Sequence, residues 1–117
     1  MNSDADDLLP LPPATFHILV ALADGDRHGY AIMQEVAGRT GGALKLSAGT
    51  LYRSIQRMLE QGLVVEVGTP ARTLSDDERR RYYRLTGFGR EVAKAEAQRL
   101  SQMLALARAS GFAPRKA

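Results

Sequence analysis

The segment from 45 to 59, KLSAGTLYRSIQRML, limits the fold of this chain more than any other. Its apolar side chains recur at the period of an α-helix, so they line one face of a single helix. They are Leu51, Ile55, Met58 and Leu59. Ser47 precedes them at the N-cap position, where its hydroxyl can accept a hydrogen bond from a free backbone amide. We therefore expect a helix with one face on a core and the other face polar.

The polar face of this predicted helix carries residue types that suit DNA. Arg53 and Arg57 lie one turn apart, so each can reach a guanine edge or a phosphate, and Gln56 can pair with adenine. Short residues at the helix N-terminus leave amides free for a phosphate. The candidate DNA-binding residues of this segment are Ser47, Gly49, Thr50, Tyr52, Arg53, Gln56 and Arg57. The alternative is an ordinary solvated helix face.

Two further helices are expected before this segment. The run ATFHILVALAD is apolar nearly all round and follows Pro13, so it predicts a buried helix that ends around Gly25. The run HGYAIMQEVAGRTGG has apolar residues at helical spacing and then glycines, which predicts a second helix after a tight connection. His17 and His28 are expected to be structural, because the chain has no cysteine and no carboxylate at metal-ligand spacing.

A β-hairpin is expected after the amphipathic helix. The run LVVEVG alternates, which places Leu63, Val65 and Val67 on one side of a half-buried strand. The run RYYRLT predicts a second strand, with Tyr83 in the core and Tyr82 open. Three helices followed by a hairpin are the parts of a winged helix-turn-helix, in which the third helix can enter the major groove of DNA.

The hairpin loop would then be a wing that reaches DNA. Its arginines can approach phosphates or a narrow minor groove. The candidate residues are Arg79, Arg80, Arg81 and Tyr82. Acidic residues 76–78 precede them and subtract from the positive field, so pairing between these acids and the arginines is the competing interpretation.

The last part of the chain predicts a long helix that begins after Thr86, which can serve as its N-cap. Apolar residues recur along it at alternating steps of four and three, which is the spacing of a coiled-coil seam. The seam comprises Ala93, Ala97, Leu100, Met103, Leu104 and Ala107. A second chain or the body of the domain must cover it, and the spacing favours a second chain.

Composition sets broad limits. The chain has 117 residues, which is the size of one domain, and a formal net charge of +3 that is compatible with a polyanionic partner. The absence of cysteine fits a reducing compartment. The start of the chain is acidic, lacks the pattern of a signal peptide, and no segment is apolar enough to span a bilayer, so a cytoplasmic protein with no membrane partner is expected.

Three motifs of the chain, taken together, resemble the PadR family of bacterial transcriptional regulators. They are HGYAIMQEV, KLSAGTLYRSIQRMLEQGLV and RRRYYRLTGFGR, in that order, over roughly residues 14 to 95. The resemblance implies a winged helix domain, a homodimer held by the C-terminal helix, and binding of a palindromic operator in double-stranded DNA. It also implies repression that a small-molecule effector can relieve. Arg53 and Ala48 depart from the family, which often has proline at both positions.

The expected fold is therefore mainly α with a small antiparallel β-hairpin. Residues 1–12 are expected to be a flexible acidic tail, 13–86 a winged helix DNA-binding domain, 87–112 a C-terminal dimerisation helix and 113–117 a tail. We predict a sequence-specific DNA-binding regulator, with a winged-helix module that docks a partner protein as the alternative. No cofactor or metal is expected. We also do not expect an enzyme, because no nucleophile with a neighbouring base and no phosphate-binding motif occurs in the sequence.

Overall fold

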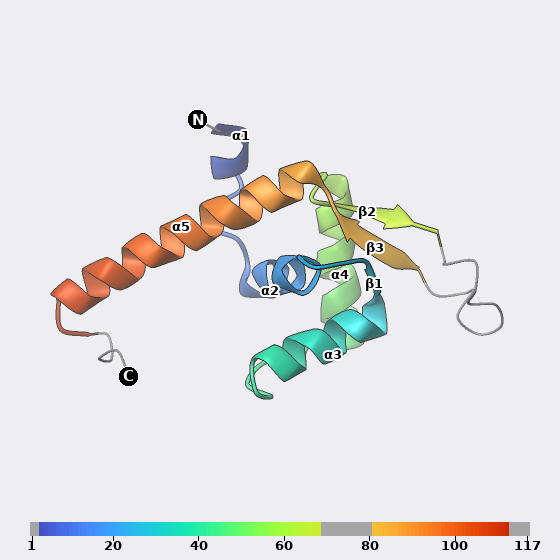
Figure 1. Cartoon of the computed structure of the whole chain (residues 1–117), viewed down its shortest axis with the longest axis horizontal. Coiled ribbons are helices and arrows are strands. Elements are labelled where there is room, and N and C mark those ends of the chain that lie inside the picture. Colours follow the sequence, from blue (N-terminus) through green and yellow to red (C-terminus); the bar gives the residue numbers. More distant parts are fainter. Residues whose placement is uncertain (1–2, 69–80, 113–117) are drawn as a thin grey trace.

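The chain folds into a mainly helical domain with a small sheet at one end (Figure 1). The computed structural model describes residues 3–68 and 81–112. The helices are α1 (Ser3–Asp6), α2 (Pro13–Ala21), α3 (Gly29–Arg39), α4 (Ala48–Glu60) and α5 (Gly87–Ala109). The strands are β1 (Arg27–His28), β2 (Val64–Val67) and β3 (Tyr82–Leu85).

Side-chain caps define the starts of three helices. The Ser47 hydroxyl accepts a hydrogen bond from the Thr50 amide at 3.1 Å, which confirms the predicted start of α4. The Thr86 hydroxyl accepts one from the Gly89 amide at 2.8 Å, as predicted for α5. At α3 the cap is His28, whose Nδ1 accepts from the Ala31 amide at 3.2 Å. An N-cap is worth about 1 kcal/mol, so these contacts help to set where each helix begins.

The core lies where α2, α3 and α4 meet the sheet and the first part of α5. Met58 of α4, Ile18 of α2 and Ile32 of α3 are each fully buried. Complete burial of such a side chain stabilises the fold by about 1.5–3 kcal/mol. Leu51, Ile55 and Met58 are buried and Leu59 partly so, which confirms the predicted apolar face of α4. This packing fixes which face of α4 is left for solvent.

The sheet has three antiparallel strands in the order β1-β3-β2, so the predicted hairpin of β2 and β3 is confirmed and β1 adds a third strand to it. Arg27 pairs with Tyr83 and His28 with Tyr82, across the sheet from β2. Sequence patterns missed β1 because a strand of two residues has no period to detect. Its pairing ties the start of α3 to the base of the wing.

The inward face of β2 differs from the one predicted by alternation. Val64 is buried and Val65 is 43% exposed, whereas the pattern placed Val65 inside. Gly62 has φ +78°, and Leu63 donates its amide to Met58, so Leu63 still belongs to the turn that follows α4. The strand therefore begins one residue later than expected, which reverses the faces.

The segment predicted as a flexible tail is packed in the residues that the structure describes. Ala5 of α1 is fully buried and Leu11 is 7% exposed. Helix α1 lies beside α5 (Figure 1). A short helix with a buried alanine has too weak a period to be recognised in an acidic sequence, so this contact was missed.

Candidate nucleic-acid interface

The polar face of α4 is open to solvent as predicted. Gly49, Arg53, Gln56 and Arg57 are exposed along it, and Thr50 is half-buried. Neither Arg53 nor Arg57 forms an ion pair within the ranges 3–68 and 81–112. Gln56 makes only a long 3.4 Å hydrogen bond to Glu60. The arginines are therefore available to an anionic partner.

The first turn of α4 brings Arg53 close to the helix N-terminus. A Cβ added at Gly49 would lie 3.4 Å from Nη1 of Arg53, so the guanidinium group folds back over this turn. The Ser47 hydroxyl accepts from the Thr50 amide and also donates to the Thr50 hydroxyl at 3.1 Å. Ser47 therefore caps the helix, and the positive charge beside its first turn comes from Arg53.

Tyr52 lies against α3 rather than pointing its hydroxyl outward. A Cβ at Gly29 would overlap the Tyr52 hydroxyl oxygen, so glycine is required for this close contact. The ring remains 49% exposed. Gly29 therefore serves the packing of α3 against α4, and a Tyr52 hydroxyl that contacted a phosphate would have to leave Gly29.

A groove of about 570 Å³ separates α4 from the start of α3 and the base of the wing. Its floor includes Ile55 and Leu59, and its walls include Tyr30, Tyr52 and Tyr83. Burial first, and then the negative charge of Glu66, raise the pKa of Tyr83 above 10.0, so its hydroxyl stays protonated at neutral pH. The groove thus combines an apolar floor with tyrosine hydroxyls and with the charged side chains of Glu66 and Arg81.

The described part of the wing presents less free positive charge than predicted. Arg81 is exposed and lies 3.6 Å from Glu66, a weak surface pair. Tyr82 is half-buried and packs edge-on against His28, with ring centroids 5.3 Å apart, so it is less open than expected. Arg79, Arg80 and the acids at 76–78 lie outside the described residues.

Arg84 is held within the domain by Asp26. Its Nε and Nη2 donate to the two carboxylate oxygens of Asp26 at 3.1 and 2.9 Å. These hydrogen bonds raise the pKa of Arg84. Arg84 faces the same side of β3 as Tyr82, two residues before it, but its charge is neutralised by a residue 58 positions away.

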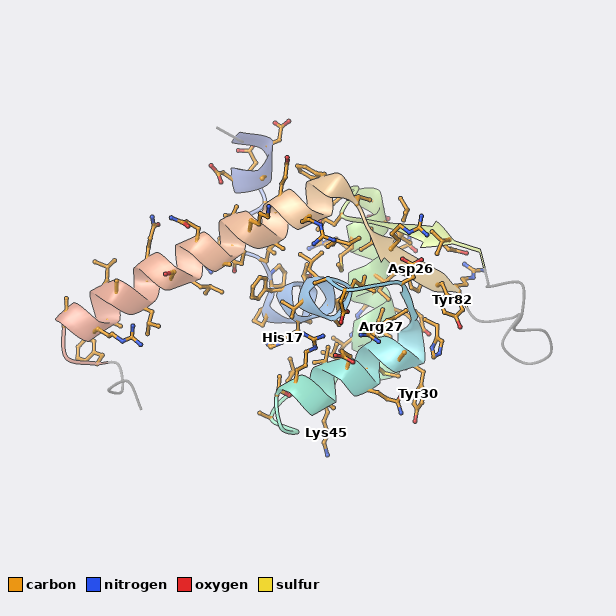
Figure 2. The ribbon with its side chains drawn as sticks, viewed as in Figure 1. His17, Asp26, Arg27, Tyr30, Lys45 and Tyr82 are labelled. Carbon is orange, nitrogen blue, oxygen red and sulfur yellow. The ribbon has the colours of Figure 1, made fainter. Side chains whose placement is uncertain are left out.

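Two exposed residues near α4 were not among the predicted DNA-binding residues. Tyr30, 56% exposed, stands at the first turn of α3, and Lys45 precedes the cap of α4. Both side chains point away from the body of the domain (Figure 2). The sequence did carry a signal for Lys45, since it is a cation two residues before an N-cap.

The apolar seam of α5 is largely uncovered by its own chain. Leu100, Met103 and Leu104 are 40%, 53% and 42% exposed, Ala97 is exposed, and Ala93 and Ala107 are half-buried. The C-terminal part of α5 projects beyond the other helices (Figure 1). The open alternative, that the body of the domain covers this seam, is therefore wrong for residues 100–104.

The described residues hold neither a cluster of metal ligands nor a membrane-spanning helix. Within 3–68 and 81–112, no three His, Asp or Glu side chains lie together as metal ligands would. In the same ranges, no helix has the length and apolar character needed to cross a membrane.

Comparison with known proteins identifies the relatives of this fold. The model of the transcriptional regulator PadR-like family matches residues 18–95. The chain belongs to this family. Membership confirms the predicted family, which is a family of transcriptional regulators.

Individual relatives agree with this membership. An uncharacterised protein of Lysinibacillus sphaericus is 38% identical over 73 residues, which cover 62% of this chain and 64% of that protein. A PadR family transcription regulator from Clostridium difficile has a TM-score of 0.70 at 24% identity, over 83% of this chain and 96% of that one. Bacillus subtilis PadR in complex with operator DNA has a TM-score of 0.61 at 19% identity, over 72% and 46%. The solved structures show the shared winged-helix fold.

Proposed function

We propose that this PadR-like regulator is a homodimeric repressor that binds a palindromic DNA operator through α4 and the wing. The observation that carries the proposal is the pair of exposed arginines on the polar face of α4, Arg53 and Arg57, which have no ion-pair partner among residues 3–68 and 81–112. Other arginines, including Arg84 and Arg39, are paired with acids inside the domain. The solved complex of Bacillus subtilis PadR with operator DNA supports the same use of the fold here.

Each part of the α4 surface has a role in this proposal. Arg53 and Arg57 contact guanine edges or phosphates, and Gln56 contacts an adenine. The backbone amides of the first turn, with Ser47, Gly49 and Thr50 around them, donate hydrogen bonds to a phosphate. Arg79, Arg80, Arg81 and Tyr82 contact the DNA backbone or minor groove from the wing. Tyr52 holds α4 on Gly29 and flanks the surface.

The homodimer is supported by the exposed seam of α5. Leu100, Met103 and Leu104 form an apolar strip on a helix that projects from its own domain. A second copy that packs the same strip against this one would remove it from water, as a closed symmetric interface requires. Two α4 helices related by this symmetry match the two half-sites of a palindrome.

Repression, its relief by a small-molecule effector and a cytoplasmic location complete the proposal. They follow from the family likeness and from DNA as the partner.

A fluorescence anisotropy titration with the DNA just upstream of the protein's own coding region tests this function. The affinity is expected to fall steeply with salt, with a log–log slope of about −0.9 per phosphate contact. The double variant Arg53→Glu and Arg57→Glu is expected to lose binding while it stays dimeric by size-exclusion chromatography. The control is Lys94→Glu with Arg108→Glu, which makes the same change of charge on exposed residues of α5.

Two outcomes would reject the proposal. Binding that does not weaken between low and moderate salt would exclude a phosphate-dominated complex. Unchanged binding by the α4 double variant would remove these arginines from the mechanism and favour a winged-helix module that docks a protein.

A further inference from the structure

Helix α5 holds a carboxylate that is buried far from the α4 surface. Glu96 is 2% exposed, and among the described residues only it and Thr15 are buried polar residues. Arg99 donates from Nε and Nη2 to its two oxygens at 2.8 and 2.9 Å. The Leu11 backbone also lowers the pKa of this carboxylate, so it lies beside Glu96. A buried charge persists only where such partners compensate its desolvation, so this is a specific joint.

The partner at this joint is the N-terminal segment. Ala5 of α1 is fully buried and Leu11 is 7% exposed, and α1 lies against α5 (Figure 1). Helix α2 also packs on α5 directly after this segment. Residues 5–11, which we call the strap, therefore join the N-terminal part of α5 to the domain that carries α4. The arrangement limits rotation of α5 relative to that domain.

We propose that Glu96 is a positioning residue for DNA recognition, because it fixes the strap of residues 5–11 and thereby the angle between α5 and the winged domain. This inference rests on the proposed homodimer. In that dimer the exposed part of α5 joins the two copies, so this angle sets the separation of the two α4 helices. The separation of the α4 helices in turn selects the spacing between operator half-sites.

The effect of a looser joint is large on the scale of DNA. Half-sites one helical turn apart are about 34–36 Å apart, so each α4 lies roughly 17 Å from the symmetry axis. With a lever arm of about that length from the joint to α4, a rotation of about 10° about the joint would move α4 by about 3 Å, close to the rise of one base pair. A dimer in which α5 rotates freely relative to the winged domain would therefore bind half-sites at several spacings. A dimer with a fixed angle would bind half-sites at one spacing.

Spin labelling can measure this separation directly, because the chain has no cysteine. A nitroxide on Glu60→Cys reports the α4-to-α4 distance in the DNA-free dimer by double electron–electron resonance, and Glu60 is an exposed residue outside the proposed DNA contacts. The variants are Glu96→Ala, which removes the acceptor, and Glu96→Gln, which keeps an oxygen beside the Leu11 backbone. Gln98→Ala is the matched control, an exposed residue of the same helix.

The expected result is a narrow distance distribution for the labelled protein with no further substitution, for Glu96→Gln and for Gln98→Ala. Glu96→Ala is expected to broaden or shift it by about 3 Å or more. Ala5→Glu, which displaces α1 and leaves Glu96 and Arg99 in place, should do the same, and it decides the question if circular dichroism shows that Glu96→Ala does not fold. A variant that only lowered stability would leave the distance unchanged.

The outcomes separate this inference from the proposed function. Dimers with unchanged distance distributions in Glu96→Ala and Ala5→Glu would overturn the role of Glu96 and leave the homodimer standing. A protein with intact Glu96 that shows no distance between labels and elutes as a monomer would overturn the homodimer, and this inference with it.

Discussion

Helices α4 and α5 are both amphipathic, yet they complete the fold in opposite ways. The apolar face of α4 is covered by its own chain, with Leu51 and Met58 fully buried, and its polar face carries unpaired arginines. Helix α5 is buried near its start, at Val92, whereas Met103 of its apolar strip is 53% exposed. Thus α4 presents polar groups to a partner, whereas α5 presents apolar groups.

An apolar or basic run in the sequence therefore becomes a binding surface only where the fold leaves it exposed. The basic residues make the same point, because Arg84 is bound by Asp26 while Arg53 is open. We therefore expect substitutions on the buried face of α4 to affect stability, those on its open face to affect DNA binding, and those on the apolar strip of α5 to affect assembly.

The largest expected effect is on stability. Met58→Ala should lower the free energy of unfolding by about 2–5 kcal/mol, because it leaves a cavity in the core. Met103→Ala, the same change on the exposed strip of α5, should cost much less for the monomer. Urea denaturation at low protein concentration measures both. Equal losses for the two variants would contradict the contrast between the helices.

The next effect is on DNA affinity. Arg53→Ala should weaken operator binding by about 1–3 kcal/mol if it contacts a base. Arg84→Ala should have a smaller effect, since its charge is already used by Asp26. Anisotropy titrations at one fixed salt concentration compare them. A larger loss for Arg84→Ala would mean that the wing, and not α4, dominates recognition.

A smaller effect is expected at the cap of α4. Ser47→Ala removes the acceptor for the Thr50 amide and should destabilise the protein by about 1 kcal/mol. Ser101→Ala, on an exposed position inside α5, lacks a cap to lose and should be neutral or slightly stabilising. Thermal unfolding followed by circular dichroism distinguishes them, and equal effects would show that the Ser47 cap is not significant.

The smallest effect is a pH dependence at the strap. The hydrogen bonds from Arg99, with a smaller contribution from its charge and the Leu11 backbone, hold the pKa of Glu96 below 4.5. Its contribution to stability is therefore fully present above the unfolded pKa and is lost as pH falls through the folded value. The difference in unfolding free energy between the protein and Glu96→Gln should shrink below about pH 4.5. A difference that grows on acidification would contradict this sign.

Local patterns predicted much of the fold. The Ser47 and Thr86 caps and the buried face of α4 depend on residues a few positions apart, so the sequence displays them. Family membership and the winged-helix fold were likewise predicted from the three motifs. The positions of Gly49, Arg53, Gln56 and Arg57 on an exposed face followed from the helical period alone.

Contacts distant in sequence could not be predicted in this way. The pairing of Arg84 with Asp26, the strand β1 and the contact between Glu96 and Leu11 each join segments more than 50 residues apart. The phase of β2 depended on Gly62, whose positive φ keeps Leu63 in the turn. Such contacts arise from tertiary packing, which the period of a single segment does not encode.

Site-specific photo-crosslinking tests the contrast between α4 and α5 most directly. A photoreactive benzoylphenylalanine replaces Gln56 of α4 in one sample and Leu104 of α5 in another, each with DNA from upstream of the coding region. The account predicts a protein–DNA adduct from position 56 and a protein–protein dimer from position 104. A position 56 that crosslinks to protein but never to DNA, or a position 104 without a dimer product, would contradict it.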